Sequence, residues 1–413
     1  MKRGLILLVI FTTVLFQQKA PAQDPNWVKE NTWYFDNFVK DVLPWSIFRE
    51  TYIGVAPAPS GDFDQIFYDQ IFKTKLASTG HCYGMDVLAM LMMKNGGYLG
   101  YCHPPYVYSG SYASRTTSDP TPSDDILGPN DPNLQTAIEM VHGYQINHSF
   151  LMFLLDVLAI GKSRDGRYTF QQVNYYLAKN DPPVISITKS VSPADGGHVL
   201  IPFFTKDMGG TKRIYVYDPN RSYYEPGNDG KDFYTTAINY IDIVSATGAW
   251  KYNMGTFGSP VYWSGNPGAD GNCIAIPLSI AGKKDRLPQS LLADGSYALN
   301  TIFIYGDVKV KQIADLSGKK KMLNDVGTDL EPCDDQRLTT VMPFIPMGVP
   351  PSSGETKSQD MYVFRGSDPV KISFTAVGEY KVGMLFHGHY YEVSGKGNGE
   401  LLNFQPLEEN IKK

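Results

Sequence analysis

Helical spacing of apolar residues dominates the first half of the chain. Residues 27–50 place aromatic and charged side chains at near-helical intervals, with a break expected at Pro44, and residues 134–160 follow a helical pattern that becomes increasingly apolar. Residues 167–183, "RYTFQQVNYYLAKNDPP", predict a short helix that is capped by Thr169 and stops before the paired prolines. Between them, residues 103–133 are rich in Pro, Ser, Thr and Asp, which predicts a long loop.

Further along the chain the pattern changes from helical to strand-like. Short β-rich runs cover residues 183–190, 198–205 and 213–218, and turns that contain Gly and Asp separate them. Because the helices precede the strands rather than alternate with them, this part of the chain is expected to be an α+β domain. Residues 273–290 then become polar toward Pro288, which indicates a connector.

Strand-like stretches return between residues 300 and 405, again separated by Gly and Asp turns. This spacing predicts a small all-β, sandwich-like domain. We therefore expect a first folded domain over residues 23–285 and a β-rich accessory domain over residues 299–413.

The first 22 residues have the pattern of a signal peptide. Lys2 and Arg3 precede an apolar run over residues 5–16, and "APAQ" at residues 20–23 has the small-x-small pattern of a cleavage site after Ala22. The apolar run is shorter than the ~20 residues that a membrane-spanning helix needs. These features predict an exported protein, periplasmic or secreted, without stable membrane insertion.

Composition supports a folded, acidic protein. The chain is 42% hydrophobic and 13% aromatic, which is typical of folded cores rather than disorder. Its net charge of −5, without a basic stripe, argues against a nucleic-acid partner. Four cysteines are too few for a disulfide scaffold in a chain of 413 residues; if Cys82 stays reduced, the pairing of Cys102, Cys273 and Cys333 is open.

Cys82 lies in "STGHCYGMDVLAML", where small residues lead into a strongly apolar helix. Apolar side chains on every face predict a helix that is buried nearly all round and ends at Gly96. Cys82 would then occupy its first turn, where the helix dipole favours the thiolate form of a thiol. Gly80 and Gly84 would allow a substrate backbone to approach closely. Since an isolated cysteine is more often a buried structural residue, a catalytic role needs a base from elsewhere in the fold.

His198 is the best candidate for that base, because it follows two glycines at the start of a predicted strand. His81 is a poorer one, since a neighbour on the same helix start points away from the thiol. The next strand ends at Asp218, and a hairpin between the two strands would place this carboxylate beside His198. Asn220 is the competing partner, but Pro219 should turn the chain away before it.

The chain order Cys82, His198, Asp218 resembles that of the papain-like cysteine peptidases, over roughly residues 45–280. The stretches "GHCYGM" and "YVYDPN" are similar to a bacterial exported branch of that superfamily. The resemblance implies a papain-like fold, with a central nucleophile helix packed on an antiparallel β-subdomain. It also implies a triad in which Cys82 attacks, His198 transfers the proton and Asp218 orients the imidazole, without a metal or an organic cofactor.

One position departs from the papain pattern. Papain has a glutamine six residues before the nucleophile, where it helps to bind the oxyanion, and this chain has Leu76 there. Ser78, Thr79 and Gln70 are the alternative side-chain donors. Loss of one such donor can cost about 10²–10³ in rate.

These features predict an exported thiol hydrolase that acts as a cysteine peptidase on a peptide or protein substrate. The alternatives are a catalytically inactive surface-binding or adhesion protein on the same scaffold, favoured by the missing glutamine, and a cell-wall peptide amidase. In each case the β-rich domain would dock on the first domain or on a cell-surface target.

Overall fold

The structure of the protein is a computed structural model. It describes residues 27–39, 43–59, 63–77, 79–108, 134–190, 196–221, 239–255, 258–288, 299–317, 321–324, 329–330, 341–345, 347–348, 360–365, 369–386, 389–407 and 411–412. The predicted signal peptide, residues 1–22, and most of the predicted loop 103–133 lie outside the described residues. No helix within the described ranges is long and apolar enough to cross a membrane.

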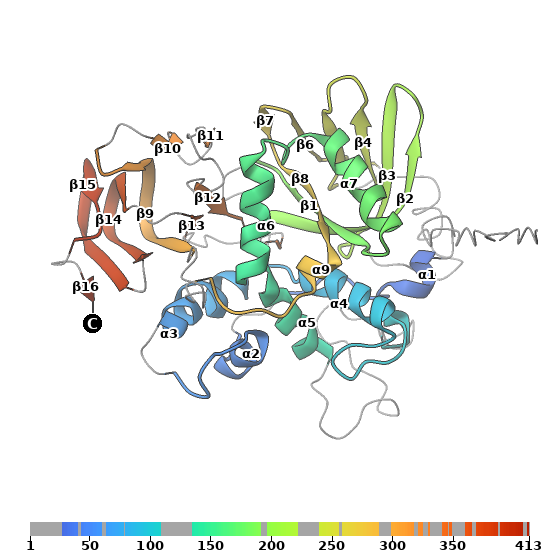
Figure 1. The fold of residues 1–413 in the computed structure, drawn as a ribbon, viewed down its shortest axis with the longest axis horizontal. Coiled ribbons are helices and arrows are strands. Elements are labelled where there is room, and N and C mark those ends of the chain that lie inside the picture. The colour runs from blue at the N-terminus through green and yellow to red at the C-terminus, as the bar shows by residue number, and fades with distance from the viewer. Residues whose placement is uncertain are drawn as a thin grey trace, which may run out of the picture.

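The protein is a mixed α+β structure, as predicted, with a layer of helices beside one antiparallel sheet and a second sheet at the C-terminal end (Figure 1). The α-helices are α1 (Trp27–Asn31), α2 (Trp45–Thr51), α3 (Phe63–Phe67), α4 (Cys82–Asn95), α5 (Leu134–His142), α6 (His148–Ala159), α7 (Gly166–Ala178) and α9 (Leu278–Ala281). A π-helix η2 (Tyr68–Leu76) and the 3-10 helices η3 (Pro105–Tyr108) and η5 (Gly143–Ile146) lie between them.

Helix α4 is the buried centre of the helical layer. Every residue from Cys82 to Met92 is buried, because apolar side chains cover all faces of the helix. The helix ends where the sequence predicts, at Gly96, whose φ of 67° is left-handed and closes the last turn. The N–H of Gly97 then donates to the carbonyl of Met92 at 2.9 Å.

Gly84 has a different role from the one that the sequence suggested. A Cβ at this position would lie 2.2 Å from the carbonyl oxygen of Ile138 and 2.9 Å from Cβ of His142, both on α5. The missing side chain therefore allows two helices to pack closely, and it is not a point of approach for a substrate backbone.

The described residues of 27–50 are helical in α1 and in α2, which begins directly after Pro44 as the predicted break requires. The described segment between the two helices is held by tertiary contacts, such as the Trp33 indole N–H that donates to the Met85 carbonyl at 2.8 Å. The predicted cap of the later helix was wrong. Helix α7 is capped by Asp165, whose carboxylate accepts from the Arg167 N–H at 3.1 Å, and not by Thr169. Thr169 lies inside the helix and its hydroxyl donates to the Cys273 carbonyl.

The first sheet is antiparallel and has the strand order β7-β6-β5-β4-β3-β2-β1-β8. Its strands are β1 (Pro183–Thr188), β2 (Gly197–Asp207), β3 (Thr211–Tyr217), β4 (Tyr240–Val244), β5 (Trp250–Asn253), β6 (Tyr262–Asn266), β7 (Ala269–Asp270) and β8 (Cys273–Pro277). Alternate residues of the strands serve opposite faces: Val199 and Ile201 pack with α4, whereas Leu200 packs with Val173 of α7. The predicted hairpin of β2 and β3 is present, with Ile201 opposite Tyr217.

The second sheet confirms the prediction of a β-rich C-terminal part. Its strands are β9 (Asn300–Asp315), β10 (Lys321–Asn324), β11 (Asp329–Leu330), β12 (Val341–Phe344), β13 (Asp360–Phe364), β14 (Val370–Phe386), β15 (His389–Phe404) and β16 (Ile411–Lys412). The long strands β9 and β14 pair along both halves, with register shifts between Ser373 and Phe374 and between Val377 and Tyr380. Within the described residues they form one continuous sheet, and side chains from both halves of these strands share one apolar core.

One end of the second sheet packs on the helices. The Phe303 ring meets the edge of the Phe67 ring at a centroid distance of 5.5 Å, and Arg365 forms an ion pair with Asp156 of α6 at 2.8 Å. The connector between the two sheets also contacts the helical layer. The backbone N–H of Ile53, two residues after α2, donates to the carbonyl of Asp285 at 3.1 Å. Strand β12 packs beside α6, between the helices and the second sheet (Figure 1).

Candidate active site

Cys82 is the first residue of α4 and is fully buried. Its position is the predicted one, at the end of the helix where unpaired N–H groups and the helix dipole favour an anion. The preceding His81 is engaged elsewhere: its ring stacks on Phe38 at 4.8 Å and lies 4.5 Å from the ring of His142. The imidazole of His81 also makes a hydrogen bond with the Phe38 carbonyl at 3.1 Å.

His198 and Asp218 form a buried pair at one end of the β2–β3 hairpin. Nε2 of His198 lies 2.8 Å from Oδ1 of Asp218, and neither side chain is more than 1% exposed. Asp218 Oδ2 accepts a hydrogen bond from the Tyr252 hydroxyl at 2.6 Å, and the Arg221 guanidinium lies 3.4 Å from the same oxygen. The carboxylate is therefore fixed from three sides, which in turn fixes the orientation of the imidazole.

The surroundings favour the charged form of both members of this pair. Burial works against a charge on His198, but Asp218 and then Cys82 overcome it and raise the pKa of His198 to about 10. Burial also opposes a charge on Asp218, but His198, followed by Arg221 and Tyr252, holds the pKa of this carboxyl well below its usual range. Cys82 is among the groups that raise the pKa of His198, and Nδ1 of His198, the nitrogen away from Asp218, is buried without a hydrogen-bond partner among the described residues.

This pair predicts a pH dependence of stability. Because the folded-state pKa of His198 is raised from 6.5 to about 10, its stabilising effect is complete below pH 6.5 and disappears as the pH rises toward 10. We expect the free energy of unfolding of the wild-type chain to decline over that range relative to Asp218→Asn, which lacks the charge that holds the proton. Urea unfolding at several pH values measures this difference, and a constant difference between the two chains would contradict the ion pair.

Asn220 does not reach the imidazole through its side chain. Its Oδ1 accepts a hydrogen bond from the Asn37 amide at 2.9 Å, while its backbone N–H donates to Oδ1 of Asp218 at 2.8 Å. The structure thus brings Cys82, His198 and Asp218 together and leaves the Asn220 side chain outside the cluster.

Asp86, one turn after Cys82, is a further buried carboxyl at the site. Both of its oxygens are buried without a hydrogen-bond partner among the described residues. Burial, then Cys82 and then Asp218, raises the pKa of Asp86 well above its usual value. The raised pKa favours the neutral form of the Asp86 carboxyl, which adds no negative charge beside the thiol.

Of the side-chain oxyanion donors suggested by the sequence, Gln70 lies in η2 and Thr79 is hydrogen-bonded to a neighbouring carbonyl. The Thr79 hydroxyl donates to the Leu76 carbonyl at 2.9 Å, and no hydrogen bond in the described part of the chain links Thr79 or Gln70 to Cys82. Leu76 is buried at the end of η2. Ser78 lies outside the described residues.

Several residues of the site could not be identified from the sequence. The carbonyl oxygen of Met347, from the loop after β12, lies 3.3 Å from Sγ of Cys82. Gln145 and Ser186 contact Met347 in turn, at 2.6 Å and 2.7 Å. Tyr252 and Arg221 were also missed, and the only local signal among these residues is the position of Arg221 three residues after Asp218.

The described cysteines form no disulfide bond and, among the described residues, belong to no cluster of metal-binding side chains. Cys82 and Cys273 are buried and Cys102 is exposed, while Cys333 lies outside the described residues. Burial raises the pKa of the Cys273 thiol to about 12, which makes it unreactive. Within the described ranges, no group of three or more His, Cys, Asp or Glu side chains could hold a metal ion.

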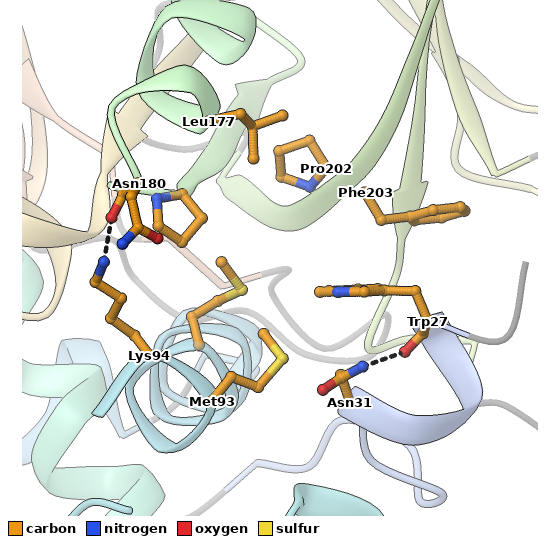
Figure 2. A pocket seen from close by; sticks show the side chains of 10 residues that line it. Trp27, Asn31, Met93, Lys94, Leu177, Asn180, Pro202 and Phe203 are labelled. Carbon is orange, nitrogen blue, oxygen red and sulfur yellow. Dashed lines mark hydrogen bonds between the residues drawn. The ribbon is translucent and has the colours of Figure 1, made fainter. Parts of the chain in front are cut away.

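The pocket shown in Figure 2 lies away from the cluster. Trp27 and Phe203 stack at 5.8 Å on one side of it, and Lys94, near the C-terminal end of α4, donates to the Asn180 carbonyl on the other. Met93 also lines this pocket, eleven residues along the helix from Cys82, which corresponds to ~16 Å. Sγ of Cys82 contacts the Met347 carbonyl oxygen instead.

Comparisons of the chain with protein-family models, with curated proteins and with solved structures gave no match.

Proposed function

We propose that the protein is an exported cysteine peptidase with a papain-like fold, in which Cys82, His198 and Asp218 are the catalytic residues. The observation that carries this proposal is the buried, charge-paired imidazole of His198, held by Asp218 and adjoining a thiol at a helix N-terminus. Such a constellation has the parts that nucleophilic catalysis requires: a nucleophile, a base beside it and a group that orients the base.

The geometry supports a specific division of roles. His198 takes the proton of the Cys82 thiol through its Nδ1 side, since Nε2 is bonded to Asp218. The thiolate attacks the carbonyl carbon of a peptide bond, and the unpaired N–H groups in the first turn of α4 stabilise the oxyanion. His198 then gives the proton to the leaving amine, and water hydrolyses the thioester to regenerate the thiol.

An inactive binding protein on the same scaffold is the second candidate. The observation that favours it is Leu76, a buried apolar side chain where papain has its oxyanion-binding glutamine. Because the backbone N–H groups of α4 are independent of that side chain, we place the peptidase first.

The reactivity of Cys82 toward iodoacetamide tests this choice. A free thiol is only a few per cent thiolate at neutral pH, so transfer of its proton to His198 should speed labelling of the wild-type chain about tenfold over His198→Ala. The ratio is informative because Met347 covers the thiol equally in both chains. Labelling of the exposed Cys102, measured by mass spectrometry in the same samples, is the internal control. Equal rates at Cys82 in the two chains would favour the inactive binding protein.

A further inference from the structure

The segment at Met347 and Gly348 lies on the candidate nucleophile in the way that a bound peptide would. The Met347 carbonyl oxygen accepts a hydrogen bond from the Cys82 thiol at 3.3 Å. The two residues are separated by 265 positions in the chain, so this contact is formed only when the C-terminal part folds back onto the helices. The segment follows strand β12 in the chain, and β12 packs beside α6.

A buried amide holds the backbone of this segment. The Met347 N–H donates to Oε1 of Gln145 at 2.6 Å. Nε2 of Gln145 donates to the His142 carbonyl at 2.9 Å, and the Gln145 side chain is fully buried. The amide oxygen is thus oriented before the segment arrives, and the N–H of any residue except proline could use it.

The side chain of Met347 fills a defined subsite. It is only 3% exposed, and its sulfur lies 2.7 Å from the Ser186 hydroxyl of β1. Ser186 is 1% exposed, so its hydroxyl contacts the segment and has almost no contact with water. Met347 also belongs to the apolar core around α4, and we expect its unbranched, flexible side chain to fit there better than a β-branched one.

The next position accepts only glycine. Gly348 pairs with Gly197, the residue before His198, in an isolated antiparallel bridge. A Cβ on Gly348 would lie 2.2 Å from the Gly80 carbonyl oxygen and 2.7 Å from Cβ and Oγ1 of Thr79. Because the first of these atoms belongs to the backbone, the segment could keep a larger residue only by moving away from Cys82.

We propose that the cleft at Cys82 binds peptide chains in which an unbranched apolar residue is followed by glycine, and that Met347 and Gly348 of the chain itself fill this cleft in cis. The proposal rests on the proposed function in taking Cys82 as the nucleophile. Because the Met347 carbonyl lies against Sγ of Cys82, the nucleophile is covered in this state and the site opens only when the segment leaves.

The test compares alkylation of Cys82 in two glycine variants. Gly348→Ala introduces the clash with Gly80 and should release the segment, so we expect iodoacetamide to label Cys82 at least about tenfold faster than in the wild-type chain. Gly210→Ala is the matched control, because no atom lies within 4 Å of the added Cβ in the turn between β2 and β3. Equal labelling rates in the wild type and in Gly348→Ala would overturn the proposal.

A second variant covers the case in which Gly348→Ala fails to fold. Met347→Ala adds no clash; it removes the contact between the thioether and Ser186 and the apolar packing of this buried side chain. Labelling of Cys82 should still accelerate several-fold, because the segment loses its anchor. An unchanged rate in a folded Met347→Ala chain would also overturn the proposal.

A synthetic peptide tests the ligand preference directly. A peptide with the sequence of residues 342–351, "MPFIPMGVPP", should protect Cys82 of Gly348→Ala from labelling, and the same peptide with alanine in place of its glycine should not. Equal protection by both peptides, or by neither, would contradict the preference for glycine. Protection does not require turnover, so it can hold even if the chain proves to be catalytically inactive. Conversely, rapid hydrolysis of other substrates without protection by this peptide would leave the proposed function standing and remove this inference.

Discussion

Replacing Cys82 or His198 by alanine is expected to abolish hydrolysis of an unfolded protein substrate, with a fall in kcat of about 10⁴–10⁶-fold in each case. Cys82→Ala removes the atom that forms the covalent intermediate. His198→Ala removes the only described side chain that adjoins the thiol and is itself held by a carboxylate. Because the two residues act as a unit, the double variant should be no slower than either single variant.

The matched controls for this experiment come from the same chain. Cys273→Ala removes another fully buried thiol, which lies on β8, and His389→Ala removes an exposed imidazole at the start of β15. Both should retain near-normal kcat. All variants should be measured with and without Gly348→Ala, so that a covered site is not mistaken for an inactive one. Substantial turnover by Cys82→Ala would exclude the proposed peptidase mechanism.

The parts of the site that lie within one helix or one hairpin could be predicted from the sequence. Cys82 begins α4 because small residues give way there to an apolar run, and Gly96 ends the helix because it adopts a left-handed conformation. His198 and Asp218 meet because short β-rich runs joined by a turn form a hairpin, in which the start of one strand lies beside the end of the next.

The parts that depend on contacts distant in the sequence could not be predicted. Nothing near Met347 marks it as a residue that folds back onto Cys82, since a single apolar residue before a glycine is common in loops. Gln145 lies in η5, where the helical pattern of residues 134–160 is broken. Its role depends on Met347, which lies in the loop after β12. Tyr252 reaches Asp218 from β5 only because the sheet places β3, β4 and β5 side by side.

The predictions that were wrong share a physical cause, which is that tertiary packing decided the local structure. Gly84 allows α5 to approach α4, although a glycine after a candidate nucleophile suggested space for a substrate. Asp165 caps α7 in place of Thr169, because the helix begins earlier than its apolar spacing indicated and Thr169 is used to bond Cys273. Helix caps and close approaches therefore need the neighbouring elements to be known.

The orienting residue gives the sharpest choice between two candidates, because Asp218 and Asn220 are only two positions apart. Asp218→Asn retains the shape of the side chain and removes its charge, so we expect kcat to fall about 10³–10⁴-fold, since the imidazole loses the group that fixes its tautomer. Asn220→Ala keeps the backbone N–H that donates to Asp218 and loses only the bond to Asn37. Its kcat should change less than about tenfold, because that bond is exposed and does not touch His198.

Two further measurements separate orientation from a general loss of structure. Thermal unfolding should show that both variants remain folded, although Asp218→Asn is expected to be less stable because the Arg221 guanidinium loses a charged partner. The pH–rate profile should change only in Asp218→Asn, because Asp218 is the largest of the influences that raise the pKa of His198. Near-normal rates in Asp218→Asn together with a collapse in Asn220→Ala would reassign the orienting role to the amide, which would require the loop after β3 to turn Asn220 toward the imidazole.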